Sequence, residues 1–417
     1  MAEGFTLPIQ VVESDGISAW LAEDHSVPVV SLSWSWQGGA GLDAAGEEGA
    51  TALMASLLTE GAGDLRARDF ADALRDDAIA LGFESQRDGF EGGFRALREA
   101  VPAALRLARL AMAAPRFDAD ALQRVRARAV AGARQIMEAP AGQARRVFWA
   151  AAYPDHPAGR PSGGTAESLA GLSEATLRAA HARQIRRDGL LVAAAGAISA
   201  EELRALLVTL FAALPAGAPP PPPPLPGFTA FGRRVVPMAF PQSTIIFGQP
   251  GLSAQDPDWE AAQVMLRVLG GGGFSSRLMQ AVRVERGLTY GISAGLDLLY
   301  GQALITGGLA TENAKVAEAL AVTGGEWRRM AETGPTEAER GDAIAYLTGS
   351  LPLQFTDSRR IASTLLSLRR NDRPLGWLAA RPARLAAITR DQLAAVAGRL
   401  LKPDAFSVVI AGQPDGL

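Results

Sequence analysis

The chain has 417 residues, of which 48% are hydrophobic and 20% are charged, and its formal net charge is −3. This composition is typical of a folded protein and excludes an extensively disordered one, and the length favours two or three domains. The small negative charge argues against a nucleic acid or an anionic membrane surface as a partner. Because there is no cysteine, disulfides, thiolate metal sites and cysteine nucleophiles are excluded.

The beginning of the sequence and its hydropathy bear on localisation. The first residues, Met-Ala-Glu-Gly-Phe-Thr, contain neither a basic n-region nor an apolar h-region. No stretch approaches the roughly 18 consecutive apolar residues of a membrane span. We therefore expect either a cytoplasmic protein or an exported one whose signal peptide is missing from this sequence.

The first half of the chain predicts one strand followed by several long helices. Apolar residues from Val30 to Trp36 alternate with serines, which is the period of a strand with one buried face. Periodic apolar positions then predict helices over about 48–60, 66–81, 95–113 and 118–137. Further on, Leu172-Ser-Glu-Ala-Thr-Leu opens a helix that leads to a buried strand ending at Gly196.

Six consecutive prolines, Pro219 to Pro224, mark the clearest boundary and are extended by Leu-Pro-Gly up to Gly227. Such a run donates no backbone hydrogen bonds and favours polyproline II, so it predicts a semi-rigid spacer. A proline-rich ligand for a recognition domain is the less favoured alternative, because folded sequence flanks the run. We predict domains over 1–216 and 228–417, with 217–227 as the linker.

The second half predicts a similar mixture of elements. Candidate strands are 244–247 and 303–306, and candidate helices are 257–269, 275–285, 313–330 and 336–349. Thr336 and Glu339 have the spacing of a capping box, in which side chain and backbone of the first helical turn bond reciprocally.

The two halves end in the same way, which predicts an internal duplication. Leu172 and Gly196 lie 24 positions apart, as do Ile388 and Gly412, and both segments read as capped helix, turn and buried strand. Thr389 begins the second of these helices in a capping-box pattern with Gln392. Strands mixed with long helices indicate an α+β fold. We therefore predict two similar α/β domains, each a mostly antiparallel sheet packed by helices.

Three segments resemble the pitrilysin family of zinc metallopeptidases, which includes mitochondrial processing peptidase. The first runs from Val27 through Gly38-Gly39 to Gly61, and the second from Tyr153-Pro-Asp-His to Leu169. The third and most specific is Leu269-Gly-Gly-Gly-Gly-Phe-Ser-Ser-Arg-Leu278, followed by Arg283-Val-Glu-Arg-Gly-Leu-Thr-Tyr290. The resemblance covers almost the whole chain and implies two similar α/β domains, in agreement with the repeat.

The zinc signature of the family is missing from this chain. Active members carry His-x-x-Glu-His on a helix, with both imidazoles as zinc ligands and the glutamate as general base. The matching positions here are Ala52, Ala55 and Ser56, and the family's further glutamate ligand would fall near 128–132, which reads Arg-Ala-Val-Ala-Gly. These degenerate metal-site positions predict that the chain holds no metal cofactor.

The three histidines do not offer a substitute site. His25, His156 and His181 lie far apart, and none has a second ligand at helical spacing. We expect His25 to be a solvent-facing turn residue and His156 to make hydrogen bonds within its loop. We expect His181 to have a dispensable surface role, since Ala397 takes its place in the second repeat.

Arg283 and Tyr290 match an arginine and a tyrosine that active members carry in the second domain. The resemblance implies that this pair binds the scissile peptide and stabilises the transition state. A guanidinium offers several donors to a peptide carbonyl, and a tyrosine hydroxyl can stabilise an oxyanion. The alternative is that Arg283 is a salt-bridge partner and Tyr290 a rim residue. The four glycines 270–273 lack the Gly-Lys-Ser/Thr ending of a phosphate loop, so they predict close backbone approach or positive φ instead.

The leading hypothesis is therefore the non-metal-binding subunit of a heteromeric zinc endopeptidase. The resemblance implies a paralogous partner that carries zinc and His-x-x-Glu-His, and a peptide substrate, with peptidase activity only in the complex. A homodimer is also possible. Bacterial relatives of this kind suggest the periplasm.

Two alternatives stay open. One is a non-catalytic scaffold or binding subunit of a larger complex, like the core subunits of respiratory complexes with this fold. The other is a hydrolase that uses Ser56 as its nucleophile, which is disfavoured because no Ser–His–Asp or Ser–Lys arrangement is visible nearby.

Overall fold

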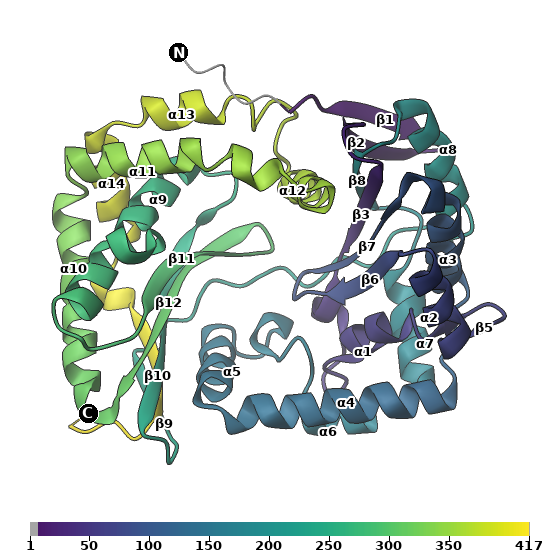
Figure 1. Ribbon diagram of the computed structural model, residues 1–417. Helices are drawn as coiled ribbons and strands as arrows, with labels where there is room; N and C mark the ends of the chain where they lie inside the picture. The colour runs from purple at the N-terminus through teal and green to yellow at the C-terminus, as the bar shows by residue number, and fades with distance from the viewer. Residues whose placement is uncertain (1–6, 417) are drawn as a thin grey trace. The chain divides into compact units, whose positions relative to one another are not determined.

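The computed structural model describes residues 7–416, which form two compact units (Figure 1). Unit 1 contains the residues up to Arg134, Arg160–Pro224 and Pro352–Ala379. Unit 2 contains Gln135–Gly159, Leu225–Leu351 and the residues from Ala380 onward. One boundary thus falls inside the predicted linker. The predicted division into 1–216 and 228–417 does not account for the other boundaries, because each half contributes one segment to the unit built mainly from the other half.

Unit 1 is built on a six-stranded sheet in the order β1-β2-β8-β3-β7-β6. The strands are β1 (Gln10–Ser14), β2 (Ile17–Glu23), β3 (Val29–Gln37), β6 (Ala80–Ser85), β7 (Gly89–Leu97) and β8 (Leu191–Gly196). Only the β2–β8 pair is parallel among the pairs of this sheet. A separate short hairpin joins β4 (Gly61–Ala62) to β5 (Leu65–Arg66). The sheet is thus mostly antiparallel, as predicted.

The helices of unit 1 cover both faces of its sheet. The helices of its first half are α1 (Ala50–Leu57), α2 (Ala67–Asp76), α3 (Val101–Ala113), α6 (Ala166–Gly171), α7 (Glu174–Gln184) and α8 (Ala200–Phe211). Trp34 of β3 packs edge-on against Phe211 of α8, on the face that holds the main core. On the other face lies α12 (Ser358–Arg370), which comes from the second half of the chain (Figure 1).

The helix α12, which the second half of the chain contributes to unit 1, explains why the predicted exposed face of β3 is buried. The alternation of apolar residues with serine predicts one buried face, yet Ser31 and Ser35 are each only 1% exposed. The hydroxyl of Ser31 lies 2.9 Å from that of Ser358 on α12. A helix distant in sequence therefore buries the serine face, which local periodicity cannot reveal.

Unit 2 repeats the topology of unit 1. Its five-stranded sheet has the order β11-β12-β10-β13-β9. The strands are β9 (Arg233–Pro237), β10 (Gln242–Ser253), β11 (Ile292–Leu299), β12 (Gln302–Glu312) and β13 (Ser407–Gly412). Here β13 and β9 form the parallel pair, as β8 and β2 do in unit 1. The two sheets therefore match strand for strand except for β1, and the predicted pair of similar α/β domains is confirmed.

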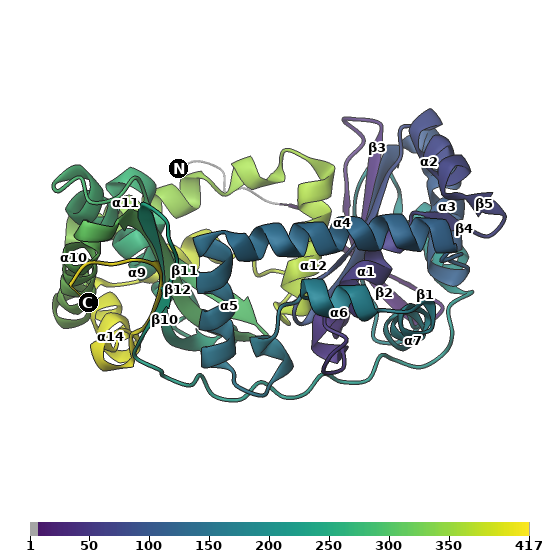
Figure 2. The same cartoon turned by 90° about the horizontal axis from the view of Figure 1, so that it is seen from below.

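The helices of unit 2 also lie on both faces of its sheet (Figures 1 and 2). The main core is covered by helices of the second half, namely α9 (Trp259–Leu266), α10 (Val316–Thr333), α11 (Glu337–Gly349), α13 (Arg381–Ala387) and α14 (Arg390–Leu400). The opposite face carries α5 (Pro140–Ala152) from the first half, which follows the long helix α4 (Ala119–Glu138). Phe148 and Trp149 of α5 pack in one apolar cluster with Val409 and Ala411 of β13.

Several predicted helix boundaries are wrong for local reasons. The helix predicted over 66–81 ends at Asp76, because Ala78 adopts a positive φ of 51° and residues from Ala80 onward form β6. The helix predicted over 95–113 begins at Val101, since the preceding residues complete β7. No helix within residues 7–416 is both long and apolar enough to cross a membrane.

The predicted capping boxes differ in completeness. Thr336 accepts a hydrogen bond from the backbone of Glu339, whose carboxylate accepts from the backbone of Thr336 in return. Thr389 accepts from the backbone of Gln392. The Gln392 side chain instead donates to Asp258, so only half of that motif forms.

Candidate functional site

The degenerate metal-site positions lie on α1, which is a packing element of unit 1. Ala55 is 3% exposed and belongs to the core, whereas Ser56 is exposed. The Ser56 hydroxyl donates to the carbonyl oxygen of Ala52 at 3.1 Å, a bond to the preceding turn that helical serines commonly make. Methyl groups and a back-bonded hydroxyl do not provide the ligands that zinc requires.

The surroundings of α1 do not replace the lost ligands. Residues 128–132 lie on α4 and contain no carboxylate or imidazole. Within residues 7–416, no group of three or more histidine, aspartate or glutamate side chains is placed to hold a metal ion. The residues present therefore do not fit a zinc ion in this chain.

A buried aspartate at the start of α1 was not anticipated from the sequence. The carboxylate of Asp43 accepts hydrogen bonds from the Thr51 hydroxyl at 2.5 Å and from the Gly49 backbone at 3.1 Å. Burial raises the pKa of Asp43 to about 6, against the opposing effect of these hydrogen bonds and of nearby Arg183. Asp43 thus satisfies donors at the N-terminus of α1, and its contacts are structural.

The structure does not bring the three histidines together. His25 is exposed and lies 2.9 Å from a carboxylate oxygen of Glu23, and Nδ1 of His156 accepts from the backbone of Ala158 at 3.1 Å. His181 differs from the prediction of a surface role. Its Nε2 lies 2.7 Å from the carbonyl oxygen of Met112, and burial lowers its pKa. His181 therefore ties α7 to α3.

The glycine-rich segment of unit 2 forms the turn that presents Arg283. Gly273 has a φ of 59°, and a Cβ atom at Gly270 would lie 2.6 Å from the backbone nitrogen of Ala294 on β11. Both predicted uses of the glycines, positive φ and close approach, are present. Within the helix predicted over 275–285, residues Met279–Val284 form a π-helical turn instead of an α-helix. Such turns are frequent at functional sites.

Arg283 and Tyr290 lie side by side on this turn, together with an aromatic residue that the sequence did not single out. The Cζ atom of Arg283 lies 4.5 Å from the ring centre of Tyr290 and 4.5 Å from that of Phe274. Tyr290 is 87% exposed and Phe274 is 60% exposed. We call these three residues the Arg283 cluster. Phe274 sits inside the glycine-rich motif, which was its only sequence signal.

The backbone around Tyr290 is held by its buried neighbours. The Thr289 hydroxyl lies 2.7 Å from the carbonyl oxygen of Ala310 on β12, and the Thr311 hydroxyl donates to the carbonyl oxygen of Leu288. The backbone N–H of Leu288 donates to Val282 at 2.9 Å. The exposed Tyr290 ring therefore extends from a segment that is fixed to the sheet.

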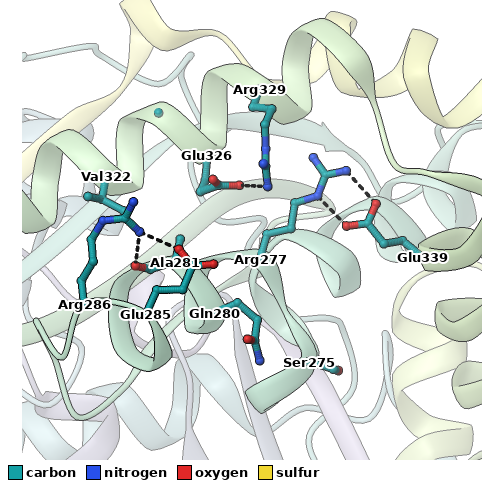
Figure 3. Close-up of a pocket in the computed structure, with 11 residues that line it drawn as sticks. Ser275, Arg277, Gln280, Ala281, Glu285, Arg286, Val322, Glu326, Arg329 and Glu339 are labelled. Atoms are coloured by element: carbon teal, nitrogen blue, oxygen red, sulfur yellow. Dashed lines mark hydrogen bonds and ion pairs between the residues drawn. The ribbon is translucent and has the colours of Figure 1, made fainter.

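A polar cleft of about 510 Å³ lies beside the same turn (Figure 3). On one side, Arg277 forms two hydrogen bonds of 2.7 Å with the carboxylate of Glu339, and on the other side Arg286 pairs with Glu285. Burial alone would raise the pKa of Glu339, but hydrogen bonds from Arg277 and Thr336 lower it to about 2. This ion pair braces the turn against α11.

Three features together define the class of protein. The fold has two matching α/β units, a helix without metal ligands in unit 1, and in unit 2 an arginine beside an exposed tyrosine. These features are those of a metallopeptidase-like protein in which residues 7–416 contain no group of side chains placed to hold a metal ion. Residues 171–347 match the family model described as the peptidase M16 inactive domain. The predicted resemblance to the pitrilysin type is confirmed.

Relatives and solved structures agree with this assignment. A peptidase M16 inactive domain from Pseudomonas fluorescens superposes with a TM-score of 0.91 at 25% identity, covering 98% of both chains. The non-peptidase homolog YmxG of Helicobacter pylori is 26% identical over 82% of this chain and 79% of its own length. An uncharacterized zinc protease of Mycobacterium tuberculosis is 32% identical over 52% of this chain and 51% of its own length.

Two further likenesses concern a processing peptidase and a chain of complex III. A probable mitochondrial-processing peptidase subunit beta of Schizosaccharomyces pombe is 27% identical over 64% of this chain and 61% of its own length. A chain of complex III from Candida albicans has a TM-score of 0.80 at 14% identity, covering 98% of this chain and 96% of its own, which shows a shared fold alone.

Proposed function

We propose that this chain is the non-metal-binding subunit of a heteromeric zinc endopeptidase. The observation that carries the proposal is the contrast between α1, which has no metal ligand, and the Arg283 cluster, which holds an exposed phenol beside a half-buried guanidinium on a fixed turn. If unit 2 had only a structural role, a tyrosine that is 87% exposed beside an arginine would add nothing to the stability of the fold.

The two side chains have distinct roles in this proposal. Arg283 binds a carbonyl oxygen of the peptide through its N–H groups and so orients the scissile bond. The Tyr290 hydroxyl donates a hydrogen bond to the oxyanion that develops when water attacks that carbonyl. A zinc ion held by a paralogous partner would supply the activated water.

The names of the relatives support a complex in which one chain binds zinc and another does not. Some relatives are named zinc proteases, one is named a non-peptidase homolog, and another is a probable subunit of a processing peptidase. A family that includes both kinds of chain provides candidates for the partner. We infer that the partner is a paralogue with an intact His-x-x-Glu-His helix.

The test is reconstitution with metal analysis. The tagged chain is purified from its native host, the co-purifying protein is identified, and zinc is measured in the complex and in each separated chain. We expect no stoichiometric zinc and no peptidase activity in this chain alone. In the complex, Tyr290→Phe should lower kcat by about 10²–10³, as the loss of one oxyanion donor does. Arg283→Ala should lower kcat/KM by about 10², because the scissile bond is no longer oriented. Wild-type turnover in both variants, with assembly intact, would contradict the proposal.

The alternative of a non-catalytic scaffold subunit is favoured by one relative, which is named a non-peptidase homolog. It makes the opposite prediction for the same complex. A scaffold would assemble with its partner, and substitution of Arg283 would leave turnover unchanged.

We also propose a periplasmic location. The test is fractionation of the native host with a chain-specific antibody, and recovery of the chain in the cytoplasmic fraction would overturn it.

A further inference from the structure

The guanidinium of Arg283 contacts aromatic rings, whereas the guanidinium groups of the neighbouring Arg277 and Arg286 form hydrogen bonds. Arg277 is bonded to Glu339, and Arg286 donates to the carbonyl oxygen of Ala281 at 2.7 Å. Within residues 7–416, the Arg283 guanidinium has neither a hydrogen bond nor an ion pair, and its contacts are the rings of Phe274 and Tyr290. Its N–H donors therefore stay available to a ligand.

Phe274 is exposed but its backbone is fixed. Its carbonyl oxygen accepts from the Gln280 side chain at 2.6 Å, and the hydroxyls of Ser275 and Ser276 donate to carbonyl oxygens of Gly272 and Gly273. Core packing does not account for a phenylalanine that is 60% exposed. The fixed turn instead places its ring against Arg283.

We propose that Phe274 is a positioning residue for Arg283. This inference rests on the proposed function, because it assigns Arg283 to the peptide carbonyl. A guanidinium is attracted to the faces of aromatic rings, and its N–H groups point outward in its own plane. Two rings at 4.5 Å limit the rotamers of Arg283 while leaving those donors free. Phe274 thus reduces the loss of side-chain entropy when Arg283 binds the peptide.

The first test measures peptidase kinetics of the assembled complex with three substitutions. Phe274→Ala and Phe274→Leu should each lower kcat/KM about threefold to tenfold, because neither offers a ring face. Phe274→Tyr keeps the ring face and should stay within about twofold of wild type. If leucine restores activity as well as tyrosine does, the ring face is not what Arg283 needs. Loss of assembly in Phe274→Ala would instead make Phe274 a partner contact and overturn the inference.

The matched control is Tyr346→Ala. Tyr346 on α11 is also an exposed aromatic residue beside an arginine, with the Cζ atom of Arg267 at 3.2 Å from its ring centre. It is outside the Arg283 cluster, so we expect wild-type kinetics. An equal loss in this variant would show that Phe274→Ala acts through general destabilisation.

The second test asks whether Phe274 acts through Arg283. In the Arg283→Ala background, Phe274→Ala should lower kcat/KM no further, since there is no guanidinium left to position. Additive losses in this double-mutant cycle would contradict the positioning role. Losses for Arg283→Ala together with wild-type kinetics for Phe274→Ala would sink this inference and leave the proposed function intact.

The third test needs no partner and so remains decisive if the proposed function fails. The Nε–Hε NMR signal of Arg283 in the full isolated chain is identified by its disappearance in Arg283→Lys. We expect fast side-chain motion at this site to increase in Phe274→Ala and to stay unchanged in Phe274→Tyr. Equal mobility in all three proteins would overturn the inference.

Discussion

The helix α1 of unit 1 and the Arg283 turn of unit 2 both carry positions that the family resemblance singles out, yet the two regions are built in opposite ways. On α1, the three positions are small side chains, with Ala55 in the core and the Ser56 hydroxyl bonded to its own helix. On the turn, Tyr290 is exposed and Arg283 is half-buried, and both keep donors free of other bonds within residues 7–416.

This difference shows which region is organised for packing and which for binding. Alanine at positions 52 and 55 has high helix propensity and fills its space, so α1 is stable without a ligand. The turn contains a π-helical segment, a positive-φ glycine and exposed rings, none of which increases stability by itself. Under the proposed function, the chemistry that this chain contributes therefore belongs to unit 2.

Restoring the family's acidic residue to α1 gives the largest expected effect in this comparison. Ala55→Glu should lower the free energy of unfolding by about 3 kcal/mol, because it places an unpaired carboxyl group and extra volume in the core. Urea unfolding at pH 7 measures the change. The matched control is Ser56→Glu, which adds the same charge at an exposed position and should stay within about 0.5 kcal/mol of wild type. Equal effects at both positions would show that α1 is not a packing element.

Removal of the ion pair between Arg277 and Glu339 should have an intermediate, pH-dependent effect on the free energy of unfolding. Because hydrogen bonds from Arg277 and Thr336 outweigh burial, the pKa of Glu339 is lowered from 4.5 to about 2. The ion pair thus stabilises the fold fully above about pH 5, and this contribution is lost as the pH falls through 4.5 toward about 2. Allowing for partial exposure of Glu339, Glu339→Gln should reduce the free energy of unfolding by ~2 kcal/mol at pH 7 and by less at pH 3.

Urea unfolding of both proteins at the two pH values checks this prediction. Glutamine keeps the capping-box pattern with Thr336, so the substitution isolates the ion pair. The control is Glu337→Gln on the same helix, whose partner Arg340 is near the surface, and it should change stability much less. A loss that does not depend on pH would show that the charge of Glu339 is not the cause.

The smallest expected effect belongs to Ser56. Ser56→Ala removes a hydroxyl that bonds only to its own helix and introduces a better helix former, so stability should rise by about 0.5 kcal/mol. Peptidase activity of the complex should not change. Thermal unfolding and a turnover assay measure both quantities. Loss of all activity in Ser56→Ala would restore the serine-hydrolase alternative and reverse the assignment of chemistry to unit 2.

Much of this organisation was predictable because it rests on local patterns. The capped helix and terminal strand repeated in each half predicted the duplication, and the two sheets share one strand order. Arg283 and Tyr290 were selected because their segment, with the glycine-rich motif before it, resembles the pitrilysin family. The structure places them in contact, while their roles in catalysis stay a prediction.

Other features depend on residues that are distant in sequence. The burial of Ser31 and Ser35 by α12, and the packing of α5 on the sheet of unit 2, result from the exchange of one helix between the halves. His181 is tied to Met112, and Phe274 stacks on Arg283, through contacts that no local pattern signals.

The sequence by itself determined the duplicated α/β fold and the linker, because periodicity, capping and proline content act over a few residues. The degenerate metal-site positions and the arginine–tyrosine pair followed from the resemblance to the pitrilysin family. Only the tertiary structure decided which helix covers which sheet and which ring holds Arg283. These contacts depend on the complementarity of surfaces that meet only in the folded chain. Because the hydrophobic effect is not directional, the apolar pattern of a helix does not specify which sheet it will cover.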